Sequence, residues 1–136
     1  MNEPERVHEK TIEIRWRDMD AVGHVNNAVY LNYLEETRDE WVDLALAGSG
    51  SSGDFVIARV AIDFRRELRQ SDDRVVVSCK LVRVGRSSIV TQETIRTSGG
   101  ELAAEAEAVL VARDTSTGRS RPLTGEERAR LEPLVV

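Results

Sequence analysis

The sequence predicts an α+β fold in which one long helix covers one face of an antiparallel sheet. Five stretches of the chain alternate apolar and polar residues, whereas only one long stretch repeats its apolar residues every three to four positions. One long helix with many strands is typical of an α+β domain. The length of 136 residues predicts a single domain over residues 1–136, with a buried core of its own.

The first strand and the long helix are predicted from a change of period near residue 28. Residues 11–17 alternate apolar and charged side chains, so we expect the first strand there. From residue 28 the apolar residues line one face of a helix over 28–47, which we expect to stop at Gly48. The members of this apolar stripe are Tyr30, Tyr33, Leu34, Thr37, Trp41, Leu44 and Ala45.

The rest of the chain predicts four strands and a short final helix. After a loop at 48–54, the next strand is expected to turn one set of apolar side chains to the same face. These are Val56, Ala58, Val60, Ile62, Phe64 and Leu68. Further strands are expected at 74–84, 88–97 and 101–113, the last two joined by a glycine-rich hairpin. Thr124 and Glu127 have the spacing of a capping box, which predicts a helix start.

The composition argues against several classes of protein. The formal net charge of −5 argues against nucleic acid as the main partner. The single cysteine, Cys79, excludes an intrachain disulfide and a cysteine-based zinc site. The polar first residues lack the apolar segment of a signal peptide, and no apolar run approaches the roughly 20 residues of a membrane span. We therefore expect a cytoplasmic protein with no membrane span.

The stretch between the first strand and the helix carries more polar residues than a turn and a helix cap require. The free N–H groups in the first turn of a helix can polarise a carbonyl group and stabilise an oxyanion. An aspartate beside them, such as Asp20, could act as a base or a nucleophile. These are the parts needed for acyl transfer to water. Aspartate, glycine and asparagine are also ordinary residues of tight turns and N-caps, so the spacing alone leaves both interpretations open.

The run from Asp18 to Asn27, with its Asp-x-Asp and Gly-His-Val-Asn-Asn elements, resembles the opening motif of hotdog-fold acyl-CoA thioesterases. It is most similar to the 4-hydroxybenzoyl-CoA thioesterase-like group, including the long-chain acyl thioesterases related to it. The match is dense over residues 14–41, where Tyr30 and Tyr33 follow on the helix. The later stretches ARVAIDFRREL and VGRSS are also similar, so the resemblance extends over most of the chain.

The resemblance implies a hotdog fold, a curved antiparallel sheet wrapped around the long helix. It implies a homodimer or homotetramer with active sites at the subunit interface. It also implies hydrolysis of an acyl-CoA or acyl-carrier-protein thioester to a free acid and a thiol, with no metal and no cofactor. The catalytic carboxylate of the family matches Asp20, and the backbone N–H that polarises the thioester carbonyl matches Asn27. Gly23 matches a position of close backbone approach.

Other residues are weaker candidates. His24 is either a general acid or substrate contact, or a residue that shapes the loop, and both interpretations stay open. We expect Asn26 to cap the helix beside the substrate. Ser87 and Ser88 are expected to contact the substrate across an interface. The arginines that could bind the phosphates of coenzyme A are Arg65, Arg66, Arg83 and Arg86.

Several residues have a structural alternative, and the function has one too. We expect Asp18 to serve in the turn or in an ion pair, Cys79 to be inert, and His8 to be solvated. Glu35 competes with Asp20 for the role of base, because another branch of the hotdog fold carries a catalytic glutamate on this helix. The alternative function is a non-catalytic protein that binds or senses acyl thioesters. A hydratase is less well supported, because its Asp and His spacing is not found.

Overall fold

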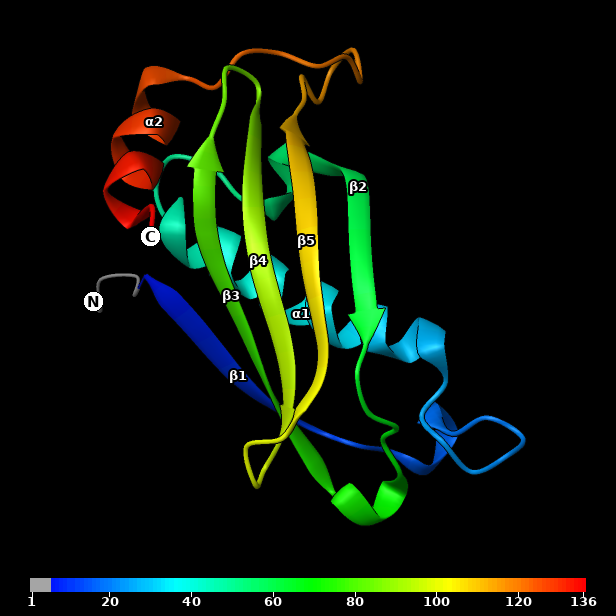
Figure 1. Ribbon diagram of the computed structural model, residues 1–136. Coiled ribbons are helices and arrows are strands. Elements are labelled where there is room, and N and C mark those ends of the chain that lie inside the picture. Colours follow the sequence, from blue (N-terminus) through cyan, green and yellow to red (C-terminus); the bar gives the residue numbers. More distant parts are fainter. Residues whose placement is uncertain (1–5) are drawn as a thin grey trace.

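A five-stranded antiparallel sheet carries one long helix across one face in the computed structural model, which describes residues 6–136 (Figure 1). The strand order is β1-β3-β4-β5-β2. The strands are β1 (Val7–Glu13), β2 (Phe55–Phe64), β3 (Arg74–Val84), β4 (Ser88–Thr97) and β5 (Leu102–Ala112). The helices are α1 (Asn27–Ala45) and α2 (Gly125–Leu131), with short 3-10 turns at Trp16–Asp18, Ser52–Asp54, Gln70–Asp72 and Glu132–Leu134. The predicted α+β plan is therefore present.

The first strand begins and ends earlier than predicted. It covers Val7–Glu13 instead of 11–17, because the chain then turns into the 3-10 segment Trp16–Asp18. The carboxylate of Asp18 accepts a hydrogen bond from the Arg15 N–H at 2.9 Å, which closes this turn. Trp16 consequently leaves the sheet and is 78% exposed.

Two side chains of β1 attach this strand to the middle of α1. His8 Nε2 lies 3.3 Å from Glu40 Oε1, and Lys10 Nζ lies 2.5 Å from Glu40 Oε2. The expectation that His8 is solvated is therefore wrong, because β1 extends far enough toward the N-terminus to place it against the helix.

A β-bulge in β2 makes the predicted face assignment wrong for the residues that precede it. The register with β5 shifts between Ile57 and Arg59, which adds one residue to β2. Ile57 pairs with Leu110 and Val60 with Ala108, and both of these partners belong to the core. Val56 therefore points away from α1, although the alternation had placed it on the same face as Val60. Alternation breaks at a bulge because the period of two loses its phase there.

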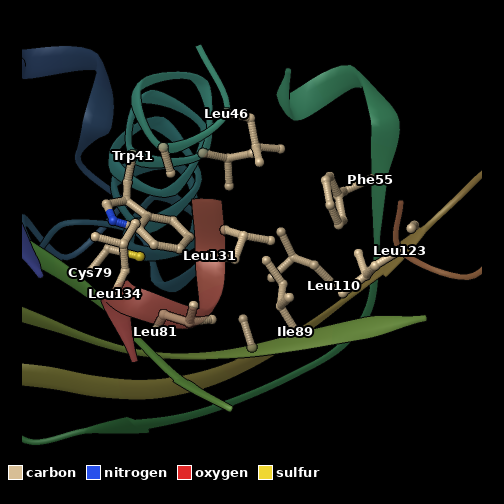
Figure 2. Packing of buried hydrophobic residues seen from close by; sticks show 14 residues of the cluster. Trp41, Leu46, Phe55, Cys79, Leu81, Ile89, Leu110, Leu123, Leu131 and Leu134 are labelled. Carbon is tan, nitrogen blue, oxygen red and sulfur yellow. The ribbon is translucent and has the colours of Figure 1, made fainter. Parts of the chain in front are cut away.

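The core consists of two apolar clusters between α1 and the sheet. The cluster near the end of α1 is centred on Trp41, and Figure 2 shows side chains from α1, the sheet and the C-terminal segment pointing toward one another there. Leu131 and Leu134 bring the C-terminal segment into this cluster. The cluster near the start of α1 includes Tyr30 and Tyr33. The apolar stripe predicted from the sequence is buried, except for Leu44, which is 45% exposed.

A buried ion pair joins α1 to β4. Arg38 Nε donates to Glu93 Oε2 at 2.7 Å and Arg38 Nη2 donates to Oε1 at 2.9 Å, while the side chains are 3% and 1% exposed. Thr91 Oγ1 donates to the same carboxylate at 2.7 Å. Arg38 and Glu93 therefore each neutralise a buried charge that would otherwise have no partner.

The edge strand β2 exposes apolar side chains. Val56, Ile57 and Phe64 are 42%, 43% and 46% exposed. The outer edge of such a strand presents unpaired backbone groups that can pair with another chain.

Within residues 6–136, no helix is long and apolar enough to cross a membrane.

Candidate active site

The turn between β1 and α1 is closed at its base by backbone contacts. Met19 and Val25 form an isolated antiparallel bridge, and the Asn26 N–H donates to the Asp18 carbonyl at 2.9 Å. Gly23 has a φ of 83°, a left-handed conformation that favours glycine. The polar residues predicted to act together are thereby collected in one closed turn.

Hydrogen bonds from the described part of the chain hold the Asp20 carboxylate in this turn through one of its two oxygens. Its Oδ1 accepts hydrogen bonds from the N–H groups of Val22 at 3.0 Å and His24 at 3.1 Å. Among residues 6–136, no group donates to the other oxygen, Oδ2. The hydrogen bond from the His24 N–H, supported by that from Val22, holds the pKa of Asp20 below its ordinary value. The group is therefore an ionised, oriented carboxylate with one free oxygen at neutral pH.

The first turn of α1 supplies a hydrogen-bond donor, the Asn27 N–H, in addition to the Asp20 carboxylate. Asn26 is the N-cap, and its side-chain oxygen accepts from the Ala28 N–H at 2.9 Å. No residue in the described part of the chain accepts a hydrogen bond from the Asn27 N–H. This N–H also lies at the positive end of a 19-residue helix. It can donate to an incoming carbonyl oxygen.

The side chain of His24 is turned to a neighbouring loop. Its Nε2 lies 3.1 Å from Glu67 Oε2, in the segment after β2. The Val25 N–H donates to the Leu68 carbonyl at 2.7 Å, so two contacts attach the turn to this segment. The imidazole thus contacts the segment after β2 in the free chain.

The remaining candidates are not all brought to this turn. Within one chain, Arg86, Ser87 and Ser88 lie at the β3–β4 turn, at the opposite end of the sheet from Asp20 (Figure 1). Glu35 lies two turns into α1 and is exposed.

The four arginines considered for phosphate binding differ in their surroundings. Arg65 Nη2 lies 2.8 Å from Glu105 Oε1, and Arg66 is paired with Asp72 and Glu101. Arg83 and Arg86 are exposed and form no ion pair with any of residues 6–136. These two are therefore better placed to meet a phosphate.

The sequence missed one part of the site. Tyr33, expected only as a core residue, donates a hydrogen bond from its hydroxyl to Asp18 Oδ2 at 2.7 Å. Asp18 Oδ1 also lies 3.2 Å from Arg15 Nη2, the kind of ion pair that was expected for it. The only signal in the sequence was the presence of a hydroxyl group on an otherwise apolar helix stripe.

Comparison with known proteins places the chain among acyl thioesterases. The family model described as Thioesterase-like superfamily matches residues 14–131. The long-chain acyl-CoA thioesterase FadM of Escherichia coli (strain K12) is 33% identical over an alignment 129 residues long, and the match covers 91% of this chain and 96% of FadM. The chloroplastic acyl-acyl carrier protein thioesterase ATL2 of Arabidopsis thaliana is 33% identical over an alignment 92 residues long, and the match covers 65% of this chain and 48% of ATL2.

A solved structure gives the same result for the fold. The crystal structure of a thioesterase from Thermus thermophilus, complexed with coenzyme A and Zn, superposes with a TM-score of 0.84 at 34% identity. The match covers 98% of this chain and 96% of that one. The predicted hotdog fold is confirmed.

In residues 6–136 of this chain, no group of three or more His, Cys, Asp or Glu side chains could hold a metal ion.

Proposed function

Because the chain belongs to the thioesterase-like superfamily and is a thioester hydrolase, we propose that Asp20 and the Asn27 N–H are its reacting groups. The observation that carries this proposal is the pairing of one free carboxylate oxygen with one free helix amide at the same turn. The carboxylate supplies the negative group that attacks or activates water. The amide supplies a donor for the oxyanion.

Two routes use these groups. In the first, Asp20 Oδ2 takes a proton from water, the hydroxide adds to the carbonyl carbon, and the carbon–sulfur bond breaks to release a thiolate that takes the proton. In the second, Oδ2 itself adds to the carbonyl carbon and the thiolate leaves. Water then hydrolyses the mixed anhydride, which returns the Asp20 carboxylate, releases the free acid and supplies the proton that the thiolate takes. A lowered pKa keeps the Asp20 carboxylate ionised at neutral pH, as both routes require. In both routes the Asn27 N–H donates to the carbonyl oxygen.

The proposed substrate is an acyl-CoA. FadM is a long-chain acyl-CoA thioesterase by name, and the Thermus thermophilus enzyme was solved with coenzyme A. Exposed arginines such as Arg83 and Arg86 offer donors suited to the phosphates of coenzyme A. The alternative carrier is acyl-carrier protein, as in the name of the Arabidopsis relative.

We also propose that the site is completed by a second copy of the chain that pairs along β2. Edge-to-edge pairing of two antiparallel β2 strands requires a two-fold axis perpendicular to the sheet. This axis reverses the strand direction, so it brings the β3–β4 turn of the partner subunit to the end of the sheet that holds Asp20. Ser87, Ser88 and Arg86 can then contribute to the site of the other subunit, which they cannot do in their own chain.

Replacing Ile57 with lysine tests this pairing. The change replaces a partly exposed apolar side chain of the edge strand β2 with a charge, so we expect the mass in solution to fall from at least twice 15.2 kDa toward that of one chain. We also expect the hydrolysis rate to fall at least about tenfold, because the site loses the partner's residues. The measurement is light scattering with a parallel thiol-release assay. Val7→Lys is the matched control: it charges the other edge strand at similar exposure and should change neither. A fully active monomer would refute the interfacial site.

The function itself is tested by thiol release from acetyl-, octanoyl-, palmitoyl- and benzoyl-CoA and from one acyl-carrier-protein thioester. Turnover of one class, with kcat/KM at least about 10⁴ M⁻¹s⁻¹, supports the proposal. Binding of acyl-CoA with no release from any substrate would instead favour the non-catalytic binding protein.

The pH dependence of the rate tests the role of Asp20. The pKa of Asp20 is lowered, so its carboxylate stays ionised as the pH falls from about 8 to about 5, and kcat/KM should stay level there. The rate should decline only toward the pKa of Asp20, below the ordinary value of 3.8. The measurement is the initial rate at each pH, with circular dichroism to verify folding. A decline within the range from about pH 8 to about 5 would assign the rate to a group other than Asp20.

A further inference from the structure

We propose that Asp18 and Tyr33 form a positioning pair that fixes the reactive turn against α1 and thereby sets the separation between the Asp20 carboxylate and the Asn27 N–H. The proposal rests on the function proposed above. Asp18 contributes the buried acceptor and Tyr33 the buried donor. Neither side chain needs to contact the substrate to have this effect.

The contact between the Asp18 and Tyr33 side chains is buried and has short hydrogen-bond distances. Asp18 is 2% exposed and Tyr33 is 3% exposed. The Tyr33 hydroxyl donates to Asp18 Oδ2 at 2.7 Å, and the Arg15 N–H donates to the same oxygen at 2.9 Å. Arg15 Nη2 donates to the other oxygen at 3.2 Å. A short hydrogen bond to a buried carboxylate is among the stronger kinds in proteins.

The protonation states make this contact persistent at neutral pH. Burial alone would raise the pKa of Asp18, but the hydrogen bonds from the Arg15 backbone and the Tyr33 hydroxyl lower it. Burial, together with the hydrogen bond to Asp18, raises the pKa of Tyr33 well above its ordinary value. The tyrosine is therefore always the donor and the aspartate always the acceptor in the working range of pH.

The backbone of Asp18 makes a second attachment to the same helix. Its carbonyl accepts from the N–H of Asn26, the N-cap of α1, at 2.9 Å. Asp18 is thus attached to α1 through its backbone and its side chain, and two attachments restrict the rotation of the turn more than one does.

The two attachments matter because, within residues 6–136, the Asp20 carboxylate accepts only from the Val22 and His24 N–H groups, which belong to the same turn. The closed turn therefore moves as a unit, and its orientation relative to α1 depends on its base at Asp18 and on the contacts to the segment after β2. A displacement of about 1 Å at a reacting group can cost about a hundredfold in rate.

Tyr33→Phe tests the pair, because it removes the donor and leaves the ring in the core. We expect kcat on the best acyl-CoA of the panel to fall about ten- to a hundredfold, while KM changes less than about threefold. Tyr30→Phe is the matched control. Tyr30 lies on the same helix, is also 3% exposed, and donates its hydroxyl to the Arg66 carbonyl at 2.9 Å, not to Asp18. Both variants should lose thermal stability, Tyr33→Phe the more because its hydroxyl donates to a charged group, but only Tyr33→Phe should lose kcat. Equal effects of the two variants on kcat would overturn the proposal.

Asp18→Asn provides a second test, since it keeps an oxygen that can accept from Tyr33. We expect a smaller loss of kcat than in Tyr33→Phe, and we expect the double variant to be no slower than Tyr33→Phe alone, because both changes act on one hydrogen bond. Fully multiplicative losses would show that the two residues act separately. Asp20→Asn is assayed in parallel. If this variant retains full activity, the proposed function is refuted. If it is inactive while Tyr33→Phe is fully active, the proposed function stands and only the positioning role of Asp18 and Tyr33 is refuted.

Discussion

Replacing Asn27 with proline is expected to lower kcat by about 10²–10³-fold, the usual loss when one oxyanion donor is removed. Proline removes the backbone N–H and nothing else that the helix uses. Asn27 is the first residue of α1, where proline is well tolerated and where the N–H has no partner inside the helix. Asn26 has φ −59° and ψ 137°, a conformation that a residue before proline readily adopts. The helix should therefore form normally without its donor.

Asn27→Ala is the control for this substitution. It removes the side chain but keeps the N–H, so kcat should stay within about threefold of the wild-type value. The measurement is steady-state thiol release by both variants, with circular dichroism to compare their helix content. Equal activity of the proline and alanine variants would exclude the Asn27 amide as the oxyanion donor, and a loss of helix in the proline variant would show up directly in the spectrum.

Replacing Arg38 with methionine is expected to lower the free energy of unfolding by about 3–5 kcal/mol. The change leaves the Glu93 carboxylate buried at 1% exposure without its partner. The measurement is urea unfolding followed by fluorescence. Arg59→Met is the control, because Arg59 forms a cross-strand ion pair with Glu107 at 3.3 Å on the surface, where such pairs are worth about 0–1 kcal/mol.

A double variant distinguishes a lost attraction from an uncompensated charge. Adding Glu93→Gln to Arg38→Met removes the buried charge and keeps an oxygen that can accept from Thr91. We expect the double variant to regain most of the lost stability. An Arg38→Met variant as stable as Arg59→Met would contradict the burial of this pair.

The architecture followed from the sequence wherever hydrophobic periodicity was unbroken. The helix predicted over 28–47 is α1, Asn27–Ala45, and the glycine-rich hairpin joins β4 to β5 as expected. The errors occur where local geometry overrides the period. Asp18 ends the first strand early by closing a 3-10 turn, and the bulge between Ile57 and Arg59 shifts the phase of β2.

The candidate site shows the same division between local and distant contacts. Asp20, Gly23 and Asn27 lie within eight residues of one another, so their shared turn could be predicted from spacing. The partners Tyr33 for Asp18, Glu67 for His24 and Glu93 for Arg38 are 15, 43 and 55 residues away. A sequence shows that such polar residues exist, but tertiary packing decides which of them meet.

The most direct test of the proposed reaction is thiol release from the preferred acyl-CoA by Asp20→Asn. Asp114→Asn is the matched control, because Asp114 accepts from the Ser116 and Thr117 N–H groups in a similar surface turn that follows β5. We predict that Asp20→Asn lowers kcat at least about a hundredfold while it still folds and binds acyl-CoA, and that Asp114→Asn stays within about twofold of the wild type. A fully active Asp20→Asn would contradict this mechanism and move the reaction to another group.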